Sequence, residues 1–231
     1  MHSEFQDLDQ GSQRNLRPAH DPRRHGSPAA VIAAVDSFAW SGQWMMNVGD
    51  RKGALLDAEV RKVVAAGGTM FLEIGTYCGY SATRIASHLG PGSRLYSLEY
   101  NPGNAAVARQ VLAHAGLEAT VQVLNGTADA CSHILKDRGV TTFDLIFLDQ
   151  WKEQYIPDLK VLMEEGFLHR GTVIVADNLI YPGNPEYIKW MESDPDFEFT
   201  LHKTLLEYSE TVEDAVGVSV FVGTTQRLAQ Q

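Results

Sequence analysis

The sequence predicts an α/β protein built around a mostly parallel sheet with helices on both faces. Between residues 69 and 177, five short runs rich in β-branched and other apolar residues alternate with helix-length segments. This alternation is typical of consecutive βαβ units, in which each crossover helix covers one face of the sheet. Two further runs, 197–208 and 215–223, are separated only by a polar loop, which predicts a terminal hairpin with an antiparallel strand.

The elements follow in order from the apolar spacing. Residues 1–27 are polar and without a periodic apolar face, so we expect a disordered or loosely attached tail before a single domain over residues 28–231. Helical spacing of apolar residues starts at Ala29, and a second helix is expected over roughly 52–66. The five strands are expected at 69–75, 93–100, 119–126, 143–149 and 171–177, and the helices between them near 80–89, 103–115, 128–137 and 155–168.

Composition narrows the class of protein. The chain has 231 residues, a formal net charge of −10 and a sequence pI near 5.2, which argues against nucleic-acid or anionic-membrane binding. No run of 18 apolar residues and no signal-peptide pattern is present, and Cys78 and Cys131 are too few for a disulfide framework. We therefore expect a soluble cytoplasmic protein, with a monomer preferred because no additional dimerisation segment is visible.

A nucleoside ligand is suggested by the ends of the first three strands. Gly75 and Gly79 lie four residues apart, which is not the spacing of dinucleotide dehydrogenases, and Gly75 could equally serve only a tight turn. Glu99 ends the second strand, where an acid can bind both ribose hydroxyls, so S-adenosylmethionine fits as a nucleoside without phosphates. Glu73 is placed to interact with the cationic methionine end of S-adenosylmethionine. Thr127 either contacts the adenosine or caps a helix.

A metal site is suggested by the ends of the fourth and fifth strands. Asp149 follows one of these strands, and Asp177 and Asn178 follow the other. Neighbouring parallel strands lie roughly 4.8 Å apart, so these side chains can converge. Two carboxylates and an amide oxygen form a set that suits Mg²⁺, although either acid alone is more simply explained as a helix cap.

Several long motifs resemble the catechol O-methyltransferase family from about Ala29 to Gly223. They are QWMMNVGDRKG (43–53), LEIGTYCGYSA (72–82), SLEYNP (97–102), FLDQWKEQYIPD (147–158), VADNLIYPG (175–183) and LLEY (205–208). The resemblance implies a Rossmann-like seven-stranded sheet of order 3-2-1-4-5-7-6 with the last strand antiparallel. It also implies Mg²⁺-dependent transfer of a methyl group from S-adenosylmethionine to one hydroxyl of a catechol.

The resemblance also implies roles for individual residues. Asp149, Asp177 and Asn178 match the metal ligands, Lys152 matches the catalytic base, and Glu207 matches the acid that hydrogen-bonds a substrate hydroxyl. Residues matching substrate contacts are Trp44, Met46, Lys152, Asn178, Pro182 and Glu207, with Trp151 also in the pocket wall. Residues at cofactor-contact positions are Val48, Glu73, Gly75, Tyr77, Ser81, Glu99, Tyr100, Thr127, Asp149, Gln150 and Trp151.

Three positions depart from the family pattern. Gln150 stands where the family usually has His, Ala128 where it has Gln near the adenine, and Tyr181 where a smaller residue is expected. The first two bear on cofactor affinity and the third on substrate shape. One alternative is therefore a related O-methyltransferase acting on a larger phenolic or hydroxamate acceptor. A non-catalytic S-adenosylmethionine-binding module is a further alternative, disfavoured because metal ligands, base and substrate acid occur together.

Overall fold

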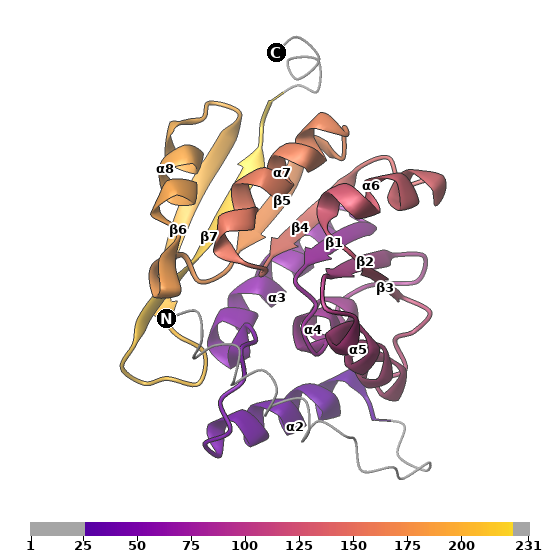
Figure 1. Cartoon of the computed structure of the whole chain (residues 1–231), viewed down its shortest axis with the longest axis vertical. Helices are drawn as coiled ribbons and strands as arrows, with labels where there is room; N and C mark the ends of the chain where they lie inside the picture. Colours follow the sequence, from indigo (N-terminus) through magenta and orange to yellow (C-terminus); the bar gives the residue numbers. More distant parts are fainter. Residues whose placement is uncertain (1–25, 224–231) are drawn as a thin grey trace.

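A computed structural model describes residues 26–223, which form a seven-stranded sheet between layers of helices (Figure 1). The strand order is β3-β2-β1-β4-β5-β7-β6, which confirms the predicted order. β7 runs antiparallel to both β5 and β6, as expected for the terminal hairpin. The strands are β1 Met70–Ile74, β2 Arg94–Glu99, β3 Val121–Asn125, β4 Phe143–Leu148, β5 Leu168–Ala176, β6 Phe197–Leu205 and β7 Glu213–Phe221. The predicted tail, apart from Gly26 and Ser27, lies outside the described residues.

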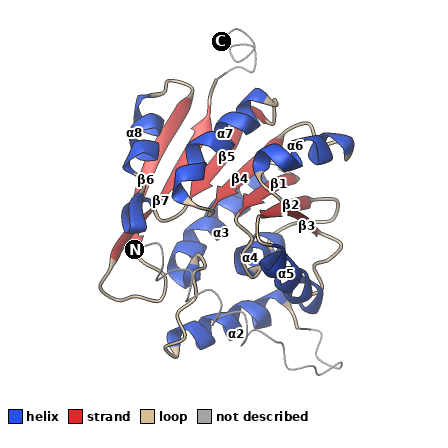
Figure 2. Ribbon diagram, viewed as in Figure 1, coloured by secondary structure: helices blue, strands red, loops and turns tan. Residues whose placement is uncertain are grey.

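Helices occupy the predicted connections, together with one that the sequence did not suggest (Figure 2). They are α2 Pro28–Trp40, α3 Gly49–Ala65, α4 Tyr80–Ser87, α5 Pro102–His114, α6 Ala128–Asp137, α7 Tyr155–Glu164 and α8 Pro185–Ser193, with short helical turns η1 Lys152–Gln154 and η2 Leu179–Gly183. The unexpected helix is α8, which begins with Asn184 accepting a hydrogen bond from the Tyr187 N–H. No helix within residues 26–223 is long and apolar enough to span a membrane.

The two faces of the sheet are buried by different helices. Leu72, Ile146 and Leu148 pack in a core with residues of α6, α7 and α8, while Leu145 and Phe147 pack in a second core with residues of α3, α4 and α5. Side chains along a strand point alternately to opposite faces, so both faces of these strands must be apolar. This explains why the central strands appear in the sequence as nearly continuous apolar runs.

The register of the central strands determines which polar residues meet beyond the sheet. Leu148 of β4 pairs with Ile74 of β1 on one side and with Ala176 of β5 on the other. The residues that follow these three strands therefore leave the sheet at the same edge. In open α/β sheets this edge, outside the carboxyl ends of the strands, is where ligands bind.

Candidate active site

Asp149 and Asp177 lie side by side just beyond the sheet. The Asp149 N–H donates to the Ile74 carbonyl at 2.9 Å, and the Asp177 N–H donates to the Leu148 carbonyl at 3.0 Å, so both residues continue the strand pairing. Asn178 comes next, with a left-handed backbone at φ +55°. The structure thus brings the three predicted metal ligands to one place, as the strand order requires.

A buried lysine lies next to this group. Lys52 of α3 has no exposed side-chain surface, and its Nζ lies 2.9 Å from Asp177 Oδ2, 2.7 Å from Glu207 Oε2 and 2.9 Å from Asp214 Oδ2. Burial alone would lower the pKa of Lys52, but attraction to the three carboxylates outweighs it and raises that pKa above its ordinary value. The three carboxylates therefore favour the ionised form of Lys52.

The amide of Asn178 is oriented by the same carboxylates. Its Nδ2 donates to Asp214 Oδ2 at 3.1 Å and lies 3.5 Å from Glu207 Oε2. Asp214 Oδ1 accepts N–H bonds from Ile180 at 3.1 Å and Tyr181 at 2.9 Å. Since the amide nitrogen is used in this way, the carbonyl oxygen of Asn178 is the atom available to ligate a metal.

Lys152 lies next to Asp149. Its Nζ donates to the Tyr155 hydroxyl at 2.6 Å and lies 3.5 Å from Asp149 Oδ1, and the Tyr155 hydroxyl donates to the Asp177 carbonyl at 3.1 Å. Asn184 Nδ2 donates to the Lys152 carbonyl at 2.6 Å and fixes the turn from the other side. The predicted base is thus held beside a predicted metal ligand.

The positive charges of the site do not compensate its carboxylates, whose pKa values are raised. Burial raises the pKa of Asp149 well above its usual range, and repulsion from Asp177 adds to the effect. Burial also raises the pKa values of Asp177 and Glu207, although Lys52 opposes it in both cases. A cation bound among these oxygens would favour their ionised forms.

The predicted ligands Asp149, Asp177 and Asn178 are chemically suited to hold Mg²⁺. Asp177 Oδ1 is buried and has no hydrogen-bond partner, although Asp177 Oδ2 contacts Lys52. The predicted ligands offer only oxygen atoms, which Mg²⁺ prefers. Within residues 26–223 no group of three or more His, Cys, Asp or Glu side chains is arranged to hold a metal. The predicted ligand set, two carboxylates and one amide, contains only two side chains of these four types.

Two acids lie on the cofactor side of the sheet edge. Glu73 is fully buried and accepts a hydrogen bond from the Ser97 hydroxyl. Burial raises the pKa of Glu73 to about 7, against the lowering effect of the Ser81 and Ser97 hydroxyls. Glu99 accepts N–H bonds from Tyr77 at 2.7 Å and Asn101 at 2.8 Å, so its carboxylate is fixed by backbone at the end of β2.

The structure clarifies two cofactor-side features that the sequence left open. Gly75 has φ +103°, and a Cβ there would lie 2.4 Å from the Asp149 carbonyl oxygen. Its lack of a side chain therefore allows β1 and β4 to approach each other where the predicted metal ligand Asp149 follows β4. Thr127 is the N-cap of α6 and accepts from the Ala130 N–H at 3.3 Å. A role for Thr127 in ligand binding stays a prediction.

The remaining predicted residues lie in connections and in the first turns of two helices. Trp44, Met46 and Val48 belong to the segment between α2 and α3; Val48 is buried, whereas Met46 is 49% exposed. Large exposed fractions are also found at Tyr100 (80%), Trp151 (65%) and Tyr181 (46%), and Pro182 is exposed in η2.

Ser81 is buried in the first turn of α4, and Ala128 is buried in the first turn of α6. Gln150 donates through Nε2 to Asp158 Oδ2 at 3.0 Å, and its Oε1 is buried without a partner.

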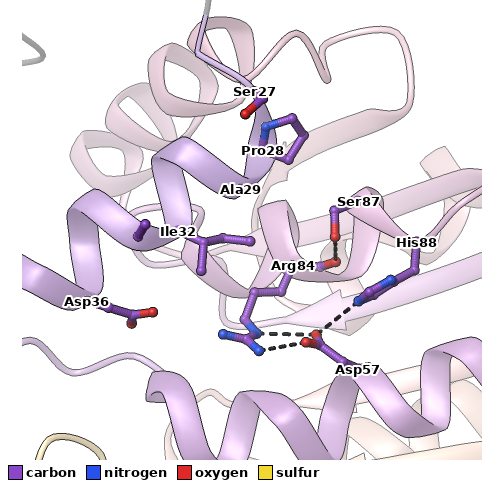
Figure 3. A pocket seen from close by; sticks show the side chains of 10 residues that line it. Ser27, Pro28, Ala29, Ile32, Asp36, Asp57, Arg84, Ser87 and His88 are labelled. Carbon is purple, nitrogen blue, oxygen red and sulfur yellow. Dashed lines mark hydrogen bonds and ion pairs between the residues drawn. The ribbon is translucent and has the colours of Figure 1, made fainter.

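A separate cavity of about 550 Å³ lies between α2, α3 and α4 (Figure 3). Its charged groups pair with one another: Arg84 binds Asp57 through Nε at 3.2 Å and Nη2 at 2.6 Å, and His88 Nε2 lies 3.4 Å from the same carboxylate. Asp36 in its wall accepts hydrogen bonds from the Tyr80 and Tyr208 hydroxyls. These groups are satisfied within the protein, so this cavity is not the candidate site.

Sequence reasoning missed three residues of the site: Lys52, Asp214 and Tyr155. One signal was available for Lys52, which lies on the same helical stripe as Leu56, Val60 and Val63, all buried. A lysine at a core position of an amphipathic helix requires buried carboxylate partners. No comparable signal marks Asp214 or Tyr155.

Comparison with known proteins identifies the family of this chain. A family model described as O-methyltransferase matches residues 34–218. Catechol O-methyltransferase B of Danio rerio is 43% identical over 91% of this chain and 79% of its own length, and catechol O-methyltransferase of Mus musculus is 41% identical over 91% and 78%. The chain belongs to the catechol O-methyltransferase family. As a member of that family it is an S-adenosylmethionine-dependent methyltransferase.

Solved structures confirm the fold of this catechol O-methyltransferase family member. An O-methyltransferase from Bacillus cereus, in complex with SAH, has a TM-score of 0.70 at 23% identity and covers 96% of this chain and 100% of its own. An O-methyltransferase involved in tomaymycin synthesis from Streptomyces achromogenes, in complex with SAM, has a TM-score of 0.71 at 22% identity, covering 84% and 90%. At these identities the likeness concerns the fold alone.

Proposed function

We propose that this protein methylates one hydroxyl of a catechol, with S-adenosylmethionine as methyl donor and Mg²⁺ held by Asp149, Asp177 and Asn178. The observation that most supports this is that Oδ1 of Asp177 is buried without a hydrogen-bond partner. Asp177 lies beside Asp149, at the same edge of the sheet as Lys152. An oxygen in this state requires a cation or another donor. The catechol O-methyltransferase names of the relatives support the same substrate class.

The proposed reaction needs two groups from the protein. One accepts the proton of the reacting hydroxyl, and the other accepts a hydrogen bond from the second hydroxyl of the catechol. Bound Mg²⁺ would supply positive charge that favours the ionised form of a catechol hydroxyl. Lys152 takes the proton of the reacting hydroxyl. Glu207 accepts a hydrogen bond from the other hydroxyl and so fixes which oxygen reacts.

Methyl transfer itself requires alignment. The donor would supply its methyl group to the hydroxyl oxygen, and its sulfur would keep the electron pair of the broken sulfur–methyl bond. Glu99 would hold the ribose hydroxyls of the donor, and Glu73 would face its cationic amino acid end. Holding the reacting atoms in line contributes a large part of such a rate enhancement.

A second candidate is O-methylation of a larger phenolic or hydroxamate acceptor. The observation that favours it is the exposure of Tyr181 (46%), Ile180 (39%) and Trp151 (65%) near the site. Apolar side chains of this size could contact an acceptor that extends beyond one ring. We further propose that the protein works as a cytoplasmic monomer without nucleic acid or membrane, which gel filtration and cell fractionation would check.

The test is incubation with S-adenosylmethionine and a panel of catechols, monophenols and hydroxamates, with Mg²⁺ or with EDTA, read by mass spectrometry. We expect the gain of one methyl group on catechols only, abolished by EDTA and by Lys152→Ala but not by the exposed-lysine control Lys189→Ala. Methylation that continues in EDTA would refute the metal-dependent proposal. Products confined to the larger acceptors would favour the second candidate.

A further inference from the structure

Lys52 joins three segments that are distant in sequence. Its ammonium contacts Asp177 after β5, Glu207 after β6 and Asp214 in β7, each at 2.7–2.9 Å. The side chain is fully buried, as are those of Asp177 and Asp214 to within 1%. An ammonium has three N–H donors, and each of the three carboxylates can take one.

The geometry assigns different tasks to the two oxygens of Asp177. Oδ2 is held by Lys52 at 2.9 Å, while Oδ1 is buried without a partner. Glu207 is held through Oε2 by the same ammonium. We propose that Lys52 is a positioning residue that fixes the metal ligand Asp177 relative to the substrate acid Glu207. This inference rests on the proposed function.

Asp214 extends this arrangement to the loop on the substrate side. One of its oxygens accepts from Lys52 and Asn178, and the other accepts the N–H groups of Ile180 and Tyr181. The metal ligand Asn178 and the η2 turn are thereby fixed to the same ammonium. Misplacing any of these groups by a fraction of an ångström would disturb the alignment that the reaction needs.

Packing alone does not account for a lysine at this position. Lys52 continues the buried stripe of α3 formed by Leu56, Val60 and Val63, where methionine would fill a similar space. Removing only the ammonium would leave three buried carboxylates without their shared cation, a change that can prevent folding. A test therefore needs a variant in which the charge is balanced.

The variants are Lys52→Met/Asp214→Asn, Asp214→Asn and Lys62→Met, made in the full chain. The double substitution removes one positive and one negative charge, so the net charge of the site is unchanged. The single variant Asp214→Asn shows how much of any effect comes from the change at Asp214 alone. Lys62 lies on the same helix with 70% of its side chain exposed, so Lys62→Met is the matched control. Circular dichroism and the thermal midpoint check folding of each protein.

The readouts are Mn²⁺ affinity, from the electron paramagnetic resonance signal of the free ion, and KM and kcat for a catechol. We expect the double variant to bind Mn²⁺ about 10-fold or more weakly than Asp214→Asn, since outer partners of metal ligands have effects of this size. Its kcat should also fall and its KM for catechol should rise, while its affinity for S-adenosylmethionine stays within about twofold. A residue needed only for packing would leave all of these values unchanged in a folded variant.

The outcomes separate this inference from the proposed function. If the unmodified protein binds Mn²⁺ and methylates catechols, but the double variant matches Asp214→Asn in affinity, KM and kcat, Lys52 is not a positioning residue. If the unmodified protein neither binds Mn²⁺ nor methylates any catechol, the proposed function fails, and the inference fails with it. A loss of Mn²⁺ affinity in the double variant alone would support both.

Discussion

Replacing Gly75 with alanine should disrupt the junction between β1, which carries Glu73, and β4, which precedes the predicted metal ligand Asp149. At Gly75 the backbone has φ +103°, and an added Cβ would lie 2.4 Å from the Asp149 carbonyl oxygen, 2.5 Å from its carbonyl carbon and 2.8 Å from the Gln150 nitrogen. All three are backbone atoms, so no side-chain rotation can make room. The chain after β4 must move, and Asp149 must move with it.

The expected loss of stability has two parts, and a variant at a second glycine, Gly67, separates them. A positive φ costs an L-residue about 1–2 kcal/mol, and forcing a methyl group into a packed region costs about 1–3 kcal/mol more. Gly75→Ala should therefore lower the free energy of unfolding by about 2–5 kcal/mol. Gly67 has φ +93° but nothing within 4 Å of its added Cβ, so Gly67→Ala should show only the first part.

Urea unfolding of both variants, followed by circular dichroism, measures the difference. Titration with Mn²⁺ in native conditions adds a second readout, because only Gly75→Ala displaces a predicted metal ligand. Equal losses of stability in the two variants, with unchanged Mn²⁺ affinity, would show that the close approach of the two strands does not hold Asp149 in place.

Three further predictions follow from individual contacts. Burial raises the pKa of Glu73 from 4.5 to about 7. The protonated carboxyl therefore contributes stability that is fully present below pH 4.5, and the free energy of unfolding should fall by up to about 3 kcal/mol as the pH rises through 7. Glu73→Gln should flatten this pH profile in urea unfolding. Asp57→Ala leaves the largely buried Arg84 without its carboxylate partner and should lower the free energy of unfolding by about 3 kcal/mol. Glu59→Ala, which breaks a surface pair on the same helix, should lower it by less than about 1 kcal/mol in the same assay. Thr127→Ala should cost about 1 kcal/mol as a lost cap, and calorimetry showing unchanged S-adenosylmethionine affinity would exclude the ligand role.

Much of the fold could be predicted because buried strands and amphipathic helices leave clear patterns. The boundaries near residue 168 could not. Phe167 and Leu168 continue the apolar pattern of α7, but the helix ends at Glu164, and β5 begins at Leu168, which pairs with Phe143 of β4. Helix α8 was missed since only Tyr187 and Met191 mark its buried side in a short, otherwise partly exposed segment.

The site shows the same limit at the level of side chains. Asp149 and Asp177 could be predicted because their positions after neighbouring strands bring them together by topology. The role of Lys52 depends on Asp177, 125 residues away, and on Asp214, 162 residues away. Only the way the terminal hairpin and α3 pack on the sheet brings these three residues into contact, and a local pattern holds no information about that packing.

The charges of the site favour a divalent cation over none. The carboxylates that share it are those of Asp149, Asp177, Glu207 and Asp214, and the ammonium groups are those of Lys52 and Lys152. The four carboxylates outnumber the two lysines, so negative charge is in excess at this site. Lys52 cannot supply what is lacking, because its ammonium already contacts three carboxylates and still leaves Asp177 Oδ1 without a partner. Burial and mutual repulsion raise the pKa of Asp149 for the same reason. A bound Mg²⁺ would cancel the remaining charge at the atom that lacks a partner, so the orientation of Asp177 and the affinity for the metal should change together when Lys52 is replaced.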